Sequence, residues 1–109
     1  MRHVLFLCSR NKWRSPTAED VFADRPGIEV DSAGLNSGAD VLISEEQVEW
    51  ADVILVMEPK HRVKLNKNFG HLLASKQVGV LNIPDDYQFM DPDLIDLLEK
   101  RCAHYLPRT

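Results

Sequence analysis

The stretch HVLFLCSRNKWRSPTAE, residues 3–19, decides how this chain folds. Its four consecutive apolar residues, Val4 to Leu7, predict a buried β-strand. The pair Ser15-Pro16 predicts a helix start, with Ser15 at the N-cap and Pro16 at the first helical position. A loop between a strand and a helix N-terminus points backbone N–H groups at a common centre. The stretch therefore predicts a binding site for a phosphate group.

A cysteine and an arginine lie at the two ends of this loop. Cys8 closes the strand and Arg14 follows six residues later. The planar guanidinium of Arg14 can donate two hydrogen bonds to a phosphate, and the positive field at the helix N-terminus favours the reactive thiolate form of Cys8. A cysteine at the end of a buried strand is otherwise an ordinary core residue. Its combination with Arg14 and Ser15 at these spacings favours a nucleophile.

The motif CSRNKWRSPTAE, residues 8–19, resembles the signature loop of the low-molecular-weight protein tyrosine phosphatases. The resemblance implies that Cys8 is the nucleophile, forming a phosphocysteine intermediate, and that Arg14 binds the phosphate. It also implies that Asn11 shapes the loop through a left-handed backbone conformation, which Asn tolerates, and that Ser15 hydrogen-bonds the thiolate. The residues expected to bind phosphate are Ser9, Arg10, Asn11, Lys12, Trp13, Arg14 and Ser15.

A second motif of the same family is Ser32-Ala33-Gly34. By this resemblance Ser32 supports the signature loop through Asn11. The alternative is an ordinary turn serine at the end of a strand.

Length and composition limit the possible classes of protein. The chain has 109 residues, of which 44% are hydrophobic and 28% charged, and this predicts a single domain over residues 1–109. The net charge of −4 argues against a nucleic-acid partner, and the apolar runs are too short to span a membrane. Two cysteines make no disulfide framework. With no signal-peptide pattern, these features predict a cytoplasmic protein.

Strand and helix patterns alternate along the chain. The predicted strands are Val4–Leu7, 28–32, 53–57 and 77–83, and the predicted helices are 16–24, a short helix after Ser44 with a capping box to Gln47, 60–68, and a final helix from Pro92. This alternation predicts a three-layer α/β/α fold, flavodoxin-like or Rossmann-like, whose four-stranded parallel sheet has the order 2-1-3-4. Binding sites in such sheets lie at the carboxyl ends of the strands.

The spacing of apolar residues in the last two predicted helices indicates which side chains face the core. In the helix over 60–68, Val63 and Leu65 are expected to point inward. The charged cluster there is interpreted as a solvated face, with attraction of phosphorylated substrates as the alternative; it consists of His61, Arg62, Lys64 and Lys67. In the final helix one packing face is expected, formed by Leu94, Leu98 and Cys102.

Hydrolysis of a phosphate ester also needs a proton donor for the leaving group, and a carboxylic acid can supply it. Asp85 directly follows the fourth predicted strand, and this placement resembles the acid loop of the family. Asp91 is the alternative, because Asp91-Pro92 is the dipeptide of that acid loop, but it also fits a helix N-cap. Asp86 is a third candidate. Tyr87 is expected either to stack on an aromatic leaving group or to be a half-buried loop residue.

The sequence therefore predicts a phosphatase that hydrolyses phosphotyrosine or other phosphate monoesters with Cys8, Arg14 and Asp85 and needs no metal or organic cofactor. The expected partners are a phosphorylated protein or a small phosphate monoester, with inorganic phosphate or vanadate as ligands. One alternative is a non-catalytic module that binds phosphate or phosphoproteins. Another is an arsenate reductase, which shares this loop and fold but needs additional cysteines to relay a disulfide.

Overall fold

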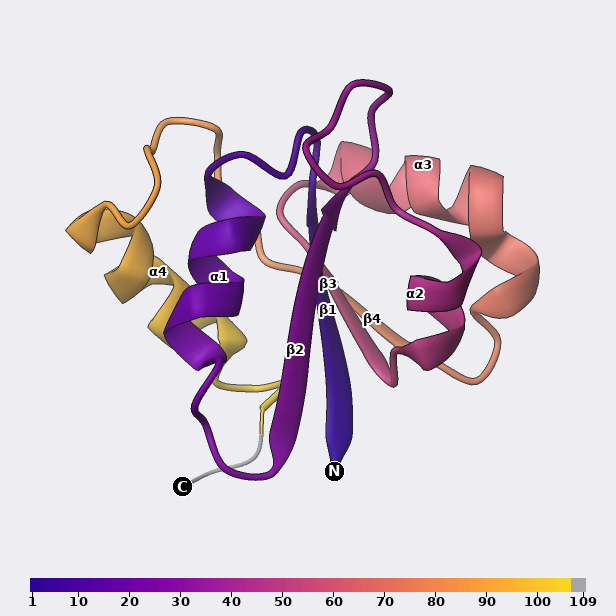
Figure 1. The fold of residues 1–109 in the computed structure, drawn as a ribbon, viewed down its shortest axis with the longest axis horizontal. Helices are drawn as coiled ribbons and strands as arrows, with labels where there is room; N and C mark the ends of the chain where they lie inside the picture. Colours follow the sequence, from indigo (N-terminus) through magenta and orange to yellow (C-terminus); the bar gives the residue numbers. More distant parts are fainter. Residues whose placement is uncertain (107–109) are drawn as a thin grey trace.

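The computed structural model describes residues 1–106 (Figure 1). The elements are β1 (Arg2–Cys8), α1 (Arg14–Phe22), β2 (Ile28–Gly34), α2 (Glu45–Trp50), β3 (Val53–Val56), α3 (Pro59–Phe69), the 3-10 helix η1 (Gly70–Leu72), β4 (Gln77–Val80) and α4 (Pro92–Cys102). Within residues 1–106, no helix has the length and apolar character needed to cross a membrane.

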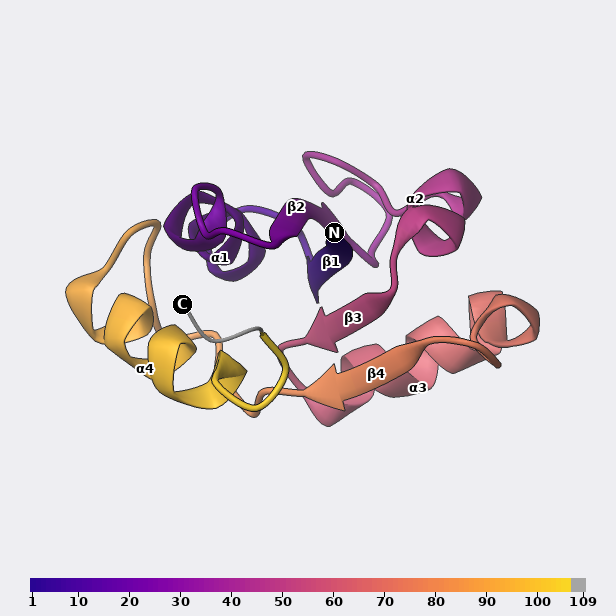
Figure 2. The same ribbon diagram turned by 90° about the horizontal axis from the view of Figure 1, so that it is seen from below.

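The four strands form one parallel sheet in the order β2-β1-β3-β4, so the predicted topology is confirmed. Helices α1 and α4 cover one face of this sheet, and α2 and α3 cover the other (Figure 2). Alternate side chains of β1 point to opposite faces of the sheet. Val4 and Phe6 pack on the side of α1 and α4, and Leu5 and Leu7 pack on the side of α2 and α3. Because β1 is central, both of its faces are apolar.

Two predicted strands end earlier than expected. β3 ends at Val56 and β4 at Val80. Beyond β4 the chain still runs beside the β3 segment. The Leu81 N–H donates to the carbonyl oxygen of Val56, and the Ile83 N–H donates to that of Met57. Between them Asn82 has a φ of 56°, a left-handed conformation that interrupts the extended backbone.

The predicted N-cap of α1 is wrong. The helix begins at Arg14 with Trp13 at the N-cap, and no side chain caps it. Ser15 instead lies in the first turn, fully buried, with its hydroxyl turned toward Cys8. The two caps predicted elsewhere are present: Ser44 and Gln47 form the capping box of α2, and Asp91 caps α4.

The face assigned to α3 is also wrong in part. Leu65 is buried as expected, but Val63 is 69% exposed, and His61 is only 3% exposed although it was placed on the solvated face. Residues four apart share a helix face, so His61 and Leu65 point the same way. Val63 lies midway between them and points outward. On α4 the predicted inward face is confirmed, because Leu94, Leu98 and Cys102 are all buried.

Candidate active site

The loop of residues 9–13, which we call the phosphate loop after its predicted role, joins the end of β1 to α1 (Figure 1). Its middle residue, Asn11, has a φ of 54°, the left-handed conformation expected from the sequence. This turn directs the Asn11 N–H back toward the strand, where it donates to Cys8 Sγ at 3.2 Å. The Ser15 hydroxyl oxygen lies 2.9 Å from the same sulfur. Cys8 is therefore held between the loop backbone and the first turn of α1.

A buried hydrogen-bond network supports the loop from behind. Asn11 Nδ2 donates to Ser15 Oγ at 3.0 Å and to Ser32 Oγ at 2.9 Å. Ser15 accepts a hydrogen bond from Asn11, and its one hydrogen has two acceptors within reach: Cys8 Sγ at 2.9 Å and the carbonyl oxygen of Ala33 at 3.4 Å. Ser32 in turn donates to a carboxylate oxygen of Glu19. The contact predicted between Ser32 and Asn11 is present, and Glu19, which was not expected, completes the network.

Arg14 is 2% exposed and is fixed by segments that follow two other strands. Its Nη1 donates to Glu58 Oε2, after β3, and to the carbonyl oxygen of Ile83, after β4, both at 2.8 Å. Its Nε lies 3.6 Å from Asp85 Oδ1. With Nη1 engaged on one side, Nε and Nη2 are the parallel pair of donors that matches two phosphate oxygens, and Asp85 Oδ1 lies beside Nε on that edge.

A pocket opens above the loop, at the carboxyl ends of the strands. It is lined by Cys8, Ser9, Arg10, Lys12, Trp13, Arg14 and Asp85. Of the residues predicted to bind phosphate, Asn11 and Ser15 are buried behind the loop, and the other five line the pocket. Three basic side chains in this lining give the pocket the charge that suits an anion.

The three candidate acids have different positions. Asp85 lines the pocket. Asp91 caps α4, since its Oδ1 accepts from the Asp93 N–H at 2.9 Å, and Asp86 is exposed outside the pocket lining. The geometry therefore brings only Asp85 of these three to Cys8 and Arg14.

His61, like Glu19 and Glu58, belongs to the site but was not predicted from the sequence. Its Nδ1 accepts from the Glu58 N–H at 3.0 Å, so its ring hydrogen is on Nε2, which lies 2.8 Å from Ser9 Oγ. Burial, followed by the charge of Arg14, lowers the pKa of His61 from 6.5 to about 4. The ring is thus a neutral donor that ties α3 to the phosphate loop. The sequence feature that could have indicated this role is the position of His61 as the third residue of α3, where the side chain of a capping box occurs.

Glu58 connects this histidine to the arginine. Burial acts to raise the pKa of Glu58, but its hydrogen bond from Arg14 and the positive charge of Arg14 outweigh that effect, and the net pKa is lowered. Glu58 therefore remains a carboxylate that holds Arg14 in place.

Comparison with known proteins finds solved structures that share the fold of this chain. No family model matches the sequence, and no curated protein does. Among solved structures, SP-PTP, the low-molecular-weight protein tyrosine phosphatase of Streptococcus pyogenes, matches with a TM-score of 0.78 and 17% identity over 97% of this chain and 91% of that chain. Wzb of Vibrio vulnificus in complex with benzylphosphonate matches at 0.77 and 20%, covering 95% and 96%. A YwlE mutant from Bacillus subtilis matches at 0.63 and 26%, covering 93% and 88%.

This chain has the fold of the low-molecular-weight protein tyrosine phosphatases. The resemblance predicted from residues 8–19 is therefore confirmed at the level of the fold.

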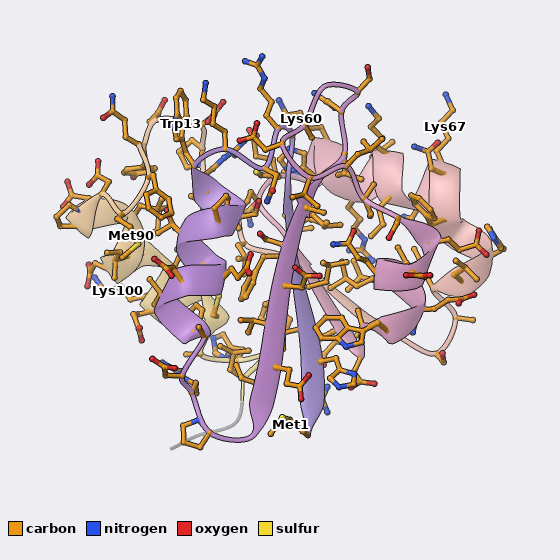
Figure 3. All side chains as sticks on the ribbon, in the orientation of Figure 1. Met1, Trp13, Lys60, Lys67, Met90 and Lys100 are labelled. Atoms are coloured by element: carbon orange, nitrogen blue, oxygen red, sulfur yellow. The ribbon has the colours of Figure 1, made fainter. Side chains whose placement is uncertain are left out.

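Within the low-molecular-weight phosphatase fold, this chain presents an aromatic side chain from the loop itself. Trp13 is 37% exposed and lines the pocket, with Lys12 Nζ 5.5 Å from the centre of its ring (Figure 3). Tyr87 is half-buried, packs against the core beside α1 and α4, and does not line the pocket. Its stacking role stays a prediction.

Cys102 bears on the alternative of an arsenate reductase. It is the second of the two cysteines of the chain, lies in the core on α4, and has its pKa raised by burial to about 12. A thiol in that state is a poor partner for a disulfide relay with Cys8, because the thiolate is the reactive form.

Proposed function

We propose that this protein is a cysteine-dependent phosphatase that hydrolyses phosphate monoesters, phosphotyrosine among them, through a phosphocysteine intermediate. One observation carries the proposal: Cys8, Arg14 and Asp85 line a single pocket, although Asp85 is separated from the other two by most of the chain.

In the first step the Cys8 thiolate attacks phosphorus, an S–P bond forms, and the bond to the leaving oxygen breaks. The Nε and Nη2 edge of Arg14 and the loop N–H groups stabilise the charge on the equatorial oxygens. Asp85 gives its proton to the departing oxygen. Ser15 donates a hydrogen bond to the sulfur when it leaves in the second step.

In the second step water attacks phosphorus, Asp85 accepts a proton from that water, and the S–P bond breaks to release inorganic phosphate and the Cys8 thiolate. Asn11 and Ser32 act as positioning residues, because they hold the loop and Ser15 without lining the pocket. The exposed ring of Trp13 provides an apolar contact for an aromatic leaving group.

The test is hydrolysis of p-nitrophenyl phosphate by the purified chain, with reductant and without added metal, beside Cys8→Ser. We expect turnover by the native protein and none by the variant. Turnover that survives in Cys8→Ser contradicts the proposed nucleophile. Absence of turnover in both, with orthovanadate still raising the melting temperature, would instead favour the non-catalytic phosphate-binding module.

A further inference from the structure

A second hollow lies beside the phosphate loop, on the other side of Ser9. We call it the lysine subsite; its lining is Ser9, Asn36, Lys60, His61 and Lys64. Ser9 lines the pocket of Cys8 as well. The two hollows are therefore adjacent, and Ser9 is the residue that lines both.

Both walls of the lysine subsite are attached to the phosphate loop. On one wall, Lys60 and Lys64 are four residues apart and share a face of α3, and His61 on the same helix contacts Ser9 Oγ. On the other wall, the Asn36 N–H donates to the Ser9 carbonyl oxygen at 2.9 Å, and Asn36 Oδ1 accepts from Lys64 Nζ at 2.9 Å. These contacts fix the position of the subsite relative to Cys8.

The charge of the lysine subsite is positive. No carboxylate is part of its lining, and His61 is neutral above a pH of about 4. Glu58 Oε2 approaches Lys60 Nζ at 3.6 Å, but Arg14 holds the same oxygen at 2.8 Å. In a chain whose net charge is −4, two lysines at a hollow beside the phosphate pocket mark a local preference for anions.

From this juxtaposition we infer that the lysine subsite binds a second anionic group of the substrate, a phosphate or a carboxylate close to the phosphate monoester. The inference rests on the proposed function, because it requires the first phosphate to lie against Cys8 and Arg14. The preferred substrate is then a phosphate monoester with a nearby negative charge. Its source is either an acidic residue beside a phosphorylated side chain or a small molecule with two phosphates.

Calorimetric titration with non-hydrolysable ligand pairs tests the inference without turnover. The first pair is a short peptide with phosphonomethyl-phenylalanine flanked by Glu or by Gln. The second pair is propane-1,3-bisphosphonate and propylphosphonate. We expect the more anionic member of at least one pair to bind about fivefold more tightly, the size expected for one or two partly exposed ion pairs.

Two double variants assign the effect to the subsite. In Lys60→Gln/Lys64→Gln the ratio of the two Kd values within the responding pair should fall to near one. The matched control, Arg62→Gln/Lys67→Gln, removes the same charge from α3 outside the subsite and should keep the native ratio. Figure 3 shows Lys60 at the end of α3 beside the loop and Lys67 toward the far end.

The outcomes distinguish an acidic phosphopeptide from a small bisphosphate as the source of the second anion. They also distinguish failure of the lysine subsite from failure of the proposed phosphatase. A preference in the peptide pair alone indicates an acidic phosphopeptide, and one in the propane pair alone indicates a small bisphosphate. Equal binding within both pairs, or an equal loss of preference in the two double variants, overturns the inference. Failure to hydrolyse p-nitrophenyl phosphate overturns the proposed phosphatase and leaves these binding measurements intact.

Discussion

His61 Nε2 donates to Ser9 Oγ at 2.8 Å and so links helix α3 to the phosphate loop. This hydrogen bond and the ion pair between Arg14 and Glu58 join the same two segments, the loop region after β1 and the start of α3. The position of the loop therefore depends on a histidine that is buried and neutral.

The neutral protonation state of His61 predicts how the free energy of unfolding depends on pH. Its pKa is about 4 in the folded chain and 6.5 when unfolded, so the unfolded chain binds more protons between these values. Its contribution is complete above pH 6.5 and is lost as the pH falls. Between pH 7.5 and 5 we expect the free energy of unfolding to fall by about 1 to 2 kcal/mol through this group.

Denaturant unfolding of native protein and His61→Gln at several pH values measures this contribution. Glutamine keeps a side-chain amide able to donate toward Ser9 but does not titrate. The other histidines are present in both proteins, so their effects cancel in the difference. Parallel pH profiles for the two proteins would contradict a buried, neutral His61.

The choice between Asp85 and Asp91 predicts different responses to the leaving group. Asp85→Asn removes the proposed proton donor and should lower kcat by about 10²- to 10⁴-fold for phenyl phosphate, whose leaving group needs the proton. The loss should be smaller for p-nitrophenyl phosphate. Kinetics with a series of substituted phenyl phosphates measures this as a steeper dependence on the pKa of the leaving phenol.

Asp91→Asn is the matched control, because it makes the same chemical change at a position that caps α4. Asparagine is also a good N-cap, so stability should change little. A steeper dependence on the leaving group in Asp91→Asn, with none in Asp85→Asn, would reverse the assignment.

The sequence was sufficient for the parts of the site that are local in the chain. Cys8, Asn11 and Ser15 lie within one strand–loop–helix unit, and the resemblance of residues 8–19 to a known signature loop implied that they meet. The sheet order followed from regular alternation of strands and helices and from the handedness of crossovers.

Contacts between distant segments were not predictable in the same way. The burial of His61 depends on α3 packing against the loop after β1, whereas its neighbours Arg62, Lys64 and Lys67 favoured a solvated face. Ser15 does not cap α1, because the helix already begins at Arg14 and the Ser15 hydroxyl contacts Cys8 Sγ. For His61, a contact between segments distant in the sequence overrode the local charge pattern.

Trp13 predicts a preference for aromatic leaving groups. Trp13→Ala removes an apolar ring from the pocket lining and should reduce kcat/KM for aryl phosphates by about three- to tenfold, the size of one aromatic contact. Alkyl phosphates, which gain little from the ring, should be affected less. Tyr87→Leu tests the competing residue, and a larger selective loss there than in Trp13→Ala would assign the stacking to Tyr87.

The two cysteines should differ sharply in reactivity. Cys8 is 3% exposed but lines the pocket beside basic side chains, whereas Cys102 is fully buried in the core, with its pKa raised by burial to about 12. Iodoacetamide at pH 7 should therefore label the folded chain once, at Cys8, and inorganic phosphate should slow the labelling by occupying the same pocket. Peptide mass mapping identifies the labelled residue, and unfolding the chain in denaturant provides the control in which both cysteines react. Labelling of Cys102 in the folded protein at a rate similar to Cys8 would mean that α4 opens readily, and it would return the arsenate reductase to consideration.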